Sequence, residues 1–395
     1  DPMAEWADVR SSYIDQYLSR HSLGHGICAE CGTTDGDIYW CRQCGDFRLC
    51  TSCCLRTHKR TPLHRLERWN GRFFERTSLK VLGMVMVLNH DDNTTCSVHD
   101  QPQDLVVVDM AGIFTVSIQV CRCPERARPT YIQIFQAGWY PATAKHTKTA
   151  VSLEVLDHYR RLKVHGALPV RAFVDALEHL MDPWQVNPPD DRYRIFGRLS
   201  RQLSFIMRVV RSGVQHDGGL DAATSGALVV TCWACPRIGI NMEPGWENAP
   251  QSDSYLHRPI LACDANFRQT CKYRPTTIPD PPLYDGLGVQ MPWDFYHDWL
   301  RTYITEVEVS HCVAFAALAQ KDTRFSTGLR WAGVIGIICA RHEVMLGLGD
   351  LERGERYKNT DFVLFWVLSR MSYKQAAITY DIACQYKKNF ARRVA

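Results

Sequence analysis

The feature that most constrains this chain is a run of cysteines and histidines between residues 28 and 64. Three Cys-x2-Cys pairs follow one another and two histidines complete the run, giving Cys28, Cys31, Cys41, Cys44, Cys50, Cys53, His58 and His64. Two thiolates two residues apart can bind one tetrahedral Zn²⁺ from a tight turn, so eight ligands predict two closed structural sites. The run holds few large aliphatic residues. Zinc affinity, on the order of 10 kcal/mol or more per site, must therefore supply much of its folding free energy.

Modules with this spacing, such as RING and B-box domains, hold their two ions in a cross-brace with interleaved ligand pairs. Interleaving predicts one ion bound by Cys28, Cys31, Cys50 and Cys53. It predicts a second ion bound by Cys41, Cys44, His58 and His64. Cys54 is then a spare thiol, although it could displace Cys53.

A second set of ligand-type residues follows in a small β module. It consists of His90, Cys96, Cys121 and Cys123. Residues separated by one position on a strand point to the same face, so the last two cysteines can share a third ion with the first two residues. The alternative is a loop histidine with three packing cysteines.

Composition narrows the class of protein. Seventeen cysteines could form disulfides, but paired spacing with histidines favours metal in a reducing compartment. No apolar stretch is long enough for a membrane span, so we expect no membrane insertion. The net charge of +4 is mild, whereas Cys41 to Lys80 holds ten Lys or Arg against three acids. Any affinity for nucleic acid is therefore expected from this module.

Apolar periodicity changes twice along the rest of the chain. Apolar residues recur at helical spacing in three segments, 151–166, 170–182 and 191–213, which predicts three helices. The third segment carries several arginines, and the face that holds them is either solvated or binds phosphate. Beyond a Gly-rich stretch, short apolar runs at 227–233, 258–267, 333–343 and 375–390 predict buried strands of an α/β sheet.

Two aspartates follow predicted strands. Asp264 ends RPILACD and Asp381 ends QAAITYD. Nucleases and transferases of the RNase H type hold two Mg²⁺ ions with aspartates on neighbouring strands and a third acid from a helix. An aspartate at a strand end is more often a cap or turn residue, so the residues alone leave both interpretations open.

Four more ligand-type residues lie in this second half. Cys232-x2-Cys235 and Cys339-x2-His342 would together make a tetrahedral zinc site. The favoured alternative is that Cys232 and Cys339 only pack and that His342 hydrogen-bonds or contacts substrate.

From Cys28 onward the chain resembles the KDZ (Kyakuja-Dileera-Zisupton) transposases of fungi with their associated CxC2-like cysteine cluster. The motifs that carry the resemblance are the cysteine run into PLHRLERWNG, LGMVMVLNH, GIFTVSIQVCRC, CWACPRIGINMEPGW, LACDANF, SHCVAFAAL, ICARHEVMLGLGDLERGERYKNTDF and YDIACQY. They cover most of the chain in the order that the family has.

The resemblance implies an α+β multidomain protein with an RNase H-like DDE core. Asp264 and Asp381 match the first two catalytic carboxylates, and Mg²⁺ or Mn²⁺ is the implied cofactor. The family's third acid is expected on a helix beyond Asp381, so the core is expected to be C-terminally incomplete. Glu343 and Glu355 precede Asp381 and do not fit the family order. The expected domains are a leader (1–25), a zinc-binding domain (26–140), a helical linker (141–222) and the core (223–395).

The implied function is cleavage and joining of DNA at transposon ends in the nucleus. The implied partner is DNA, and a homo-oligomer is compatible with the resemblance. Two other functions are open. One is a catalytically incomplete, transposon-derived protein that binds zinc and DNA. The other is a zinc-dependent protein-interaction module, since cross-brace domains commonly bind protein.

Overall fold

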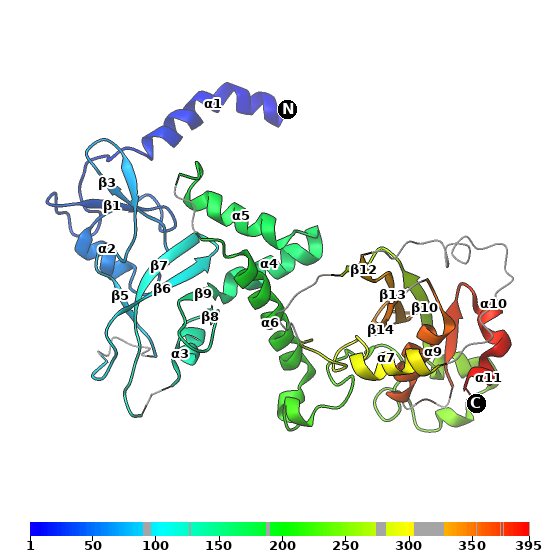
Figure 1. Cartoon of the computed structure of the whole chain (residues 1–395). Coiled ribbons are helices and arrows are strands. Elements are labelled where there is room, and N and C mark those ends of the chain that lie inside the picture. The colour runs from blue at the N-terminus through cyan, green and yellow to red at the C-terminus, as the bar shows by residue number, and fades with distance from the viewer. Residues whose placement is uncertain are drawn as a thin grey trace. The chain divides into compact units, whose positions relative to one another are not determined.

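The computed structural model describes residues 1–89, 96–125, 128–186, 190–273, 282–303, 328–352, 354–371, 373 and 375–394. The chain divides into two compact units, Asp1–Ser204 and Phe205–Ala395, and each is described by itself (Figure 1). Both units combine helices with sheets, so the predicted α+β class is confirmed. None of the helices within the described ranges is long and apolar enough to span a bilayer.

The first sheet of unit 1 forms within the cysteine run. Its order is β2-β1-β3-β4 with antiparallel neighbours, the strands being β1 (Ile38–Cys41), β2 (Arg48–Cys50), β3 (Leu66–Trp69) and β4 (Phe74–Thr77). Helix α2 (Thr51–Thr57) follows β2 directly, and α1 (Pro2–Ser19) precedes the sheet without burying a residue. The buried cluster of this sheet consists mostly of cysteines, with Tyr39, Leu49, Leu66 and Leu79. Such a small apolar core agrees with folding around metal.

The second sheet of unit 1 has an apolar core of its own. Its order is β5-β7-β6-β9-β8, built from β5 (Val85–Val87), β6 (Gln103–Asp109), β7 (Gly112–Gln119), β8 (Trp139–Pro141) and β9 (Thr149–Ser152). Alternating residues of β6 and β7, including Leu105, Val107, Val116 and Ile118, are buried in one cluster. Helix α3 (Thr130–Gln136) packs beside β8. The boundary predicted after residue 140 falls within β8.

The helices predicted from periodicity are present. They are α4 (Leu153–Gly166), α5 (Val170–Met181) and α6 (Tyr193–Ser212). Tyr159, Phe173 and Phe196 contribute one ring each, and the ring centroids lie 5.1–5.4 Å apart. This aromatic contact joins the three helices and explains why the apolar positions recur at helical spacing.

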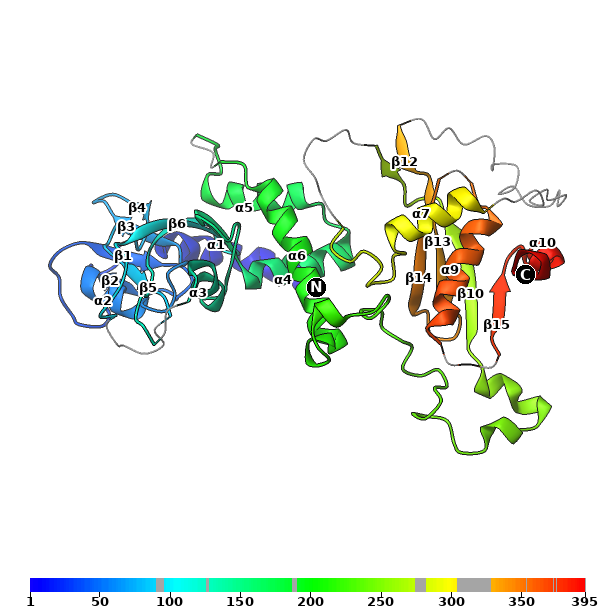
Figure 2. The ribbon, with the colours of Figure 1, turned by 60° about the horizontal axis from the view of Figure 1, so that its bottom comes forward.

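Unit 2 is built on a four-stranded sheet of order β14-β13-β10-β15, drawn in Figure 2. The strands are β10 (Ile260–Asn266), β13 (Gly333–Cys339), β14 (Met345–Leu351) and β15 (Ala377–Tyr380). β13 is antiparallel to both of its neighbours, whereas β10 and β15 are parallel. Helix α9 (Tyr357–Ser369) links β14 to β15 and packs on β13 and β14, while α7 (Trp293–Thr302) packs on α9. A two-stranded ribbon of β11 (Cys271–Lys272) and β12 (Leu329–Trp331) lies outside this sheet.

Alternation along the strands separates the two faces of this sheet. In β13 the residues Ile335, Ile337 and Cys339 are buried and join the cluster that includes Val363 and Val367 of α9. The short helices α10 (Ala383–Tyr386) and α11 (Phe390–Val394) follow β15. The predicted strands at 258–267, 333–343 and 375–390 are thus confirmed in part of each run.

The strand predicted at 227–233 is absent. Leu228 is buried, but Val230 and Trp233 are 53% and 66% exposed. The backbone N–H groups of Gly226 and Leu228 donate to the carbonyls of Gly286 and Leu287, in a loop, so this segment pairs outside the sheet. A short apolar run does not by itself reveal whether a sheet edge is within reach.

Candidate metal centres and carboxylate site

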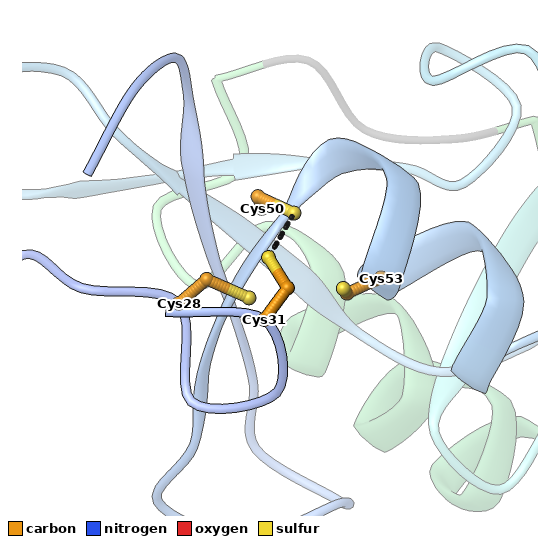
Figure 3. A group of neighbouring side chains, drawn as sticks. All are labelled: Cys28, Cys31, Cys50 and Cys53. Carbon is orange, nitrogen blue, oxygen red and sulfur yellow. Dashed lines mark hydrogen bonds between the residues drawn. The ribbon is translucent and has the colours of Figure 1, made fainter. Parts of the chain in front are cut away.

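The first ligand cluster joins a knuckle before β1 to the end of β2 and the start of α2 (Figure 3). Its members are Cys28, Cys31, Cys50 and Cys53, whose sulfurs all lie within 4.8 Å of one another. Gly32 closes the knuckle at φ 73°, a conformation that favours glycine, and donates its N–H to Cys28. The Sγ atoms of Cys31 and Cys50 are 3.7 Å apart. Zinc–sulfur bonds of about 2.3 Å in a tetrahedron require roughly this spacing, so the four sulfurs fit zinc.

The second cluster contains Cys41, Cys44, His58 and His64. The Sγ of Cys44 lies 3.3 Å from His58 Nε2 and 3.3 Å from His64 Nδ1. The other nitrogen of His58, Nδ1, lies 2.8 Å from the carbonyl oxygen of Cys54. With Nδ1 donating to that carbonyl, Nε2 is left as the ligand atom, the outer-shell arrangement common at zinc sites.

Both quartets are those that interleaved spacing predicts. Cys53, not Cys54, completes the first quartet, although Cys54 is also fully buried. Since all four positions of each tetrahedron are taken by protein atoms, the arrangement suits a structural ion.

Zinc binding to these clusters is expected to strengthen as pH rises. Burial raises the pKa of the Cys53 thiol to about 12 and that of Cys41 to about 11. Burial also acts on Cys28, but backbone hydrogen bonds from Cys31, Cys50 and Glu30 outweigh it and lower the pKa to about 6. At neutral pH the thiols whose pKa is raised are protonated, and zinc must displace these protons to bind. We expect affinity to rise roughly tenfold per pH unit for each proton released. Chelator competition between pH 6 and 8 measures this slope, and a flat profile would contradict it.

The third predicted set is described only in part. Cys96, Cys121 and Cys123 bring their sulfurs within 4.8 Å of one another, with 3.6 Å between Cys96 and Cys123. His90, the fourth predicted ligand, lies outside the described residues. Three sulfurs at this spacing could hold a metal ion with one further ligand.

The four ligand-type residues of unit 2 also come together. Cys232, Cys235, Cys339 and His342 form a group with all ligand atoms within 4.8 Å. Simple packing, the interpretation favoured from sequence, does not account for a histidine nitrogen among three sulfurs. Spacing alone could not decide this, because the two pairs are about a hundred residues apart.

The two aspartates lie on adjacent parallel strands. Cys263 of β10 pairs with Tyr380 of β15, so Asp264 and Asp381 occupy equivalent positions one residue beyond. Adjacent strands lie about 4.8 Å apart, and alternation directs both side chains to the same face. Both residues are exposed. Two carboxylates in this position offer the oxygen ligands that Mg²⁺ and Mn²⁺ prefer.

Glu355 is a third carboxylate near this pair. Burial raises its pKa, and the nearby carboxylates of Asp381 and Asp264 raise it further. The hydroxyl of Tyr380 donates a hydrogen bond to it. Sequence order argued against Glu355 because it precedes Asp381, but the fold brings it within electrostatic range of both aspartates. Such proximity has no signal in the local sequence.

Half of the ten Lys and Arg residues between Cys41 and Lys80 form ion pairs. Arg42, Arg48, Arg56, Arg68 and Lys80 each form an ion pair with a carboxylate. A cavity of about 660 Å³ nevertheless has basic residues in its wall, namely Arg42, Arg65, Arg76 and Lys80. Arg42 and Lys80 belong to the ion pairs above, and Glu67 also lines the cavity, so its wall carries charges of both signs with a basic excess.

Comparison with known proteins adds two family matches. Residues 79–185 match the CxC2-like cysteine cluster associated with KDZ transposases, and residues 257–395 match the Kyakuja-Dileera-Zisupton transposase. The first match includes Cys96, Cys121 and Cys123 and begins after the eight-ligand run. The second includes Asp264, Glu355 and Asp381. No curated protein and no solved structure matches the chain.

Proposed function

We propose that this chain, which carries a KDZ transposase domain and the cysteine cluster associated with it, is a DNA transposase. It would cleave and join DNA at transposon ends in the nucleus. The observation that carries this proposal is the parallel pairing of β10 with β15, in which Asp264 and Asp381 follow paired residues. In this proposal the carboxylates of these two residues bind divalent metal.

The sheet order supports an RNase H-like core. An antiparallel hairpin, β13 and β14, continues from a central strand, β10, which is parallel to the next strand, β15, reached through a helix. This is the arrangement in which RNase H-like enzymes hold their first two acids on neighbouring strands. A DDE mechanism for this chain follows from that likeness and from the carboxylate pair.

The chain's own residues would hold and orient the reacting groups. When bound, Mg²⁺ or Mn²⁺ activates the attacking water or 3′-hydroxyl and stabilises the leaving oxygen. Asp264 and Asp381 supply the metal ligands. Glu355, which accepts a hydrogen bond from Tyr380, is a third carboxylate whose charge interacts with those of the two aspartates.

The zinc module is proposed to bind DNA. Its two ligand quartets follow the interleaved order of a RING-like or B-box-like cross-brace. The basic residues at the 660 Å³ cavity are suited to phosphate. Binding of this kind releases counterions, so affinity should fall steeply with salt. Affinity that is insensitive to salt, or absent, would favour the protein-interaction alternative.

Metal-dependent nicking of supercoiled plasmid tests the catalytic assignment. The zinc-loaded chain is expected to nick DNA with Mg²⁺ or Mn²⁺, and Asp264→Asn to lower the rate by about 10³-fold or more, because the amide cannot replace a charged metal ligand. Asp298→Asn on α7, an exposed aspartate 3.8 Å from Arg301, is the matched control and should keep the rate.

Two outcomes would overturn the assignment. Nicking that survives Asp264→Asn would place the chemistry elsewhere. DNA binding without nicking in either metal would favour the second candidate, a transposon-derived protein that binds zinc and DNA but does not cleave.

A further inference from the structure

The segment that leads into β10 has almost no apolar anchor. Across residues 229–258, all described, Cys232 and Cys235 are the only buried residues. Large side chains in the same segment, such as Trp233 and Ile240, are 66% and 68% exposed. Hydrophobic burial therefore cannot hold this segment in place.

These two cysteines meet residues from the far end of β13. Cys339 is the last residue of β13 and is 1% exposed, while His342 lies in the turn before β14 and is exposed. His342 Nδ1 lies 3.2 Å from the sulfur of Cys232, 3.7 Å from that of Cys235 and 3.5 Å from that of Cys339. The sulfurs of Cys235 and Cys339 are 3.2 Å apart.

These distances of 3.2–3.7 Å are close to those between ligands around one metal ion. Bonds of about 2.3 Å to sulfur and 2.1 Å to nitrogen place the atoms of a tetrahedron roughly 3.5–3.8 Å apart. One imidazole nitrogen has a single hydrogen or a single lone pair, so it can satisfy only one thiol by hydrogen bonding. Here one nitrogen faces three sulfurs. A cavity of about 190 Å³ is lined in part by Cys232, Cys235 and Cys339.

We propose that Cys232, Cys235, Cys339 and His342 bind a structural Zn²⁺ that ties residues 229–258 to the end of β13. Three thiolates and one imidazole fill all four positions, so no open position remains for substrate. This site is separate from the zinc module and goes beyond the transposase assignment.

The surrounding contacts show what the ion would hold. Asn241 donates from Nδ2 to the carbonyl of Cys235, which shapes the first knuckle. Ala340 donates its N–H to Ile260, and Arg341 donates to the carbonyls of Tyr255 and Arg258. Cys339 itself is opposite Leu261 in the β10–β13 register. The ion would therefore fix the start of β10 around Leu261, three residues before Asp264.

Zinc content of the full chain tests the proposal. His342→Ala, at an exposed position that the fold should tolerate, is expected to carry one zinc ion fewer per chain than wild type. His342→Cys restores a ligand and should keep the ion. His216→Ala, an exposed histidine of the same unit, is the matched control and should lose none. Cobalt-loaded wild type minus cobalt-loaded His342→Ala should show thiolate-to-cobalt charge transfer and tetrahedral d–d bands.

Equal zinc content in wild type and His342→Ala would overturn the site. So would a thiol titration that finds Cys235 and Cys339 joined in a disulfide. If His342→Ala lowers solubility, the cobalt spectrum of His342→Cys decides: loss of the nitrogen ligand must shift the d–d bands while the intensity per chain is kept.

Discussion

Cys44→Ser is expected to unfold the cysteine module while leaving unit 2 folded. Cys44 contacts both His58 and His64, so its loss opens the second quartet. Cys41 and Cys50 end the paired strands β1 and β2, which couples the two quartets through one small sheet. Each structural zinc contributes on the order of 10 kcal/mol, more than the net stability of a typical domain. Hydrogen exchange should lose protection across β1, β2, α2 and β3.

Cys54→Ala is the matched control. Cys54 is fully buried but belongs to neither quartet, and burial raises the pKa of its thiol to about 12. The variant should keep its zinc and its exchange protection. Full zinc content in Cys44→Ser, or loss of an ion in Cys54→Ala, would show that the quartets are assigned wrongly.

Arg393→Met is expected to destabilise unit 2 by about 3–5 kcal/mol. Arg393 Nε lies 2.7 Å from Asp361 Oδ2, with side-chain exposures of 6% and 1%. The hydroxyls of Tyr303 and Tyr386 also donate to Asp361. Removal of the guanidinium leaves a buried carboxylate without its countercharge, and that desolvation cost is the physical reason for the large effect. Urea titration with exchange readout in α9 and β15 measures it.

Two further variants separate charge burial from general damage. Arg301→Met removes an exposed arginine whose partner, Asp298, is also exposed, and should change stability by less than about 0.5 kcal/mol. The double variant Asp361→Leu with Arg393→Met replaces the buried pair by apolar side chains and should recover much of the loss. An Arg393→Met chain as stable as Arg301→Met would refute the argument.

The local sequence predicted those parts of the protein in which the interacting residues are close together in the chain. The eight ligands of the cysteine run span fewer than forty positions, and their interleaved grouping followed from spacing because tetrahedral zinc accepts few arrangements. The three helices between Leu153 and Ser212 were predictable from the period of their apolar residues, because one face of each helix is buried.

Where a prediction failed or stayed open, the missing information was a distant partner. The run at 227–233 has the composition of a strand, but its backbone bonds to the loop at 286–287. The basic residues of the zinc module suggested free positive charge, but Arg42, Arg56, Arg68 and Lys80 each meet an acid from another strand or loop.

The sequence by itself determined the zinc-ligand types, their order in the first module and the identity of two candidate catalytic aspartates. Only the tertiary structure decided that Cys232 and Cys235 meet Cys339 and His342. It alone also placed Asp264 and Asp381 after paired residues of adjacent strands, with Glu355 within electrostatic range of both. The physical reason is that the spacing of metal ligands and the period of a helix are patterns that extend over only a few residues. Strand pairing joins residues over a hundred positions apart, and many registers satisfy the same apolar pattern until the sheet has closed.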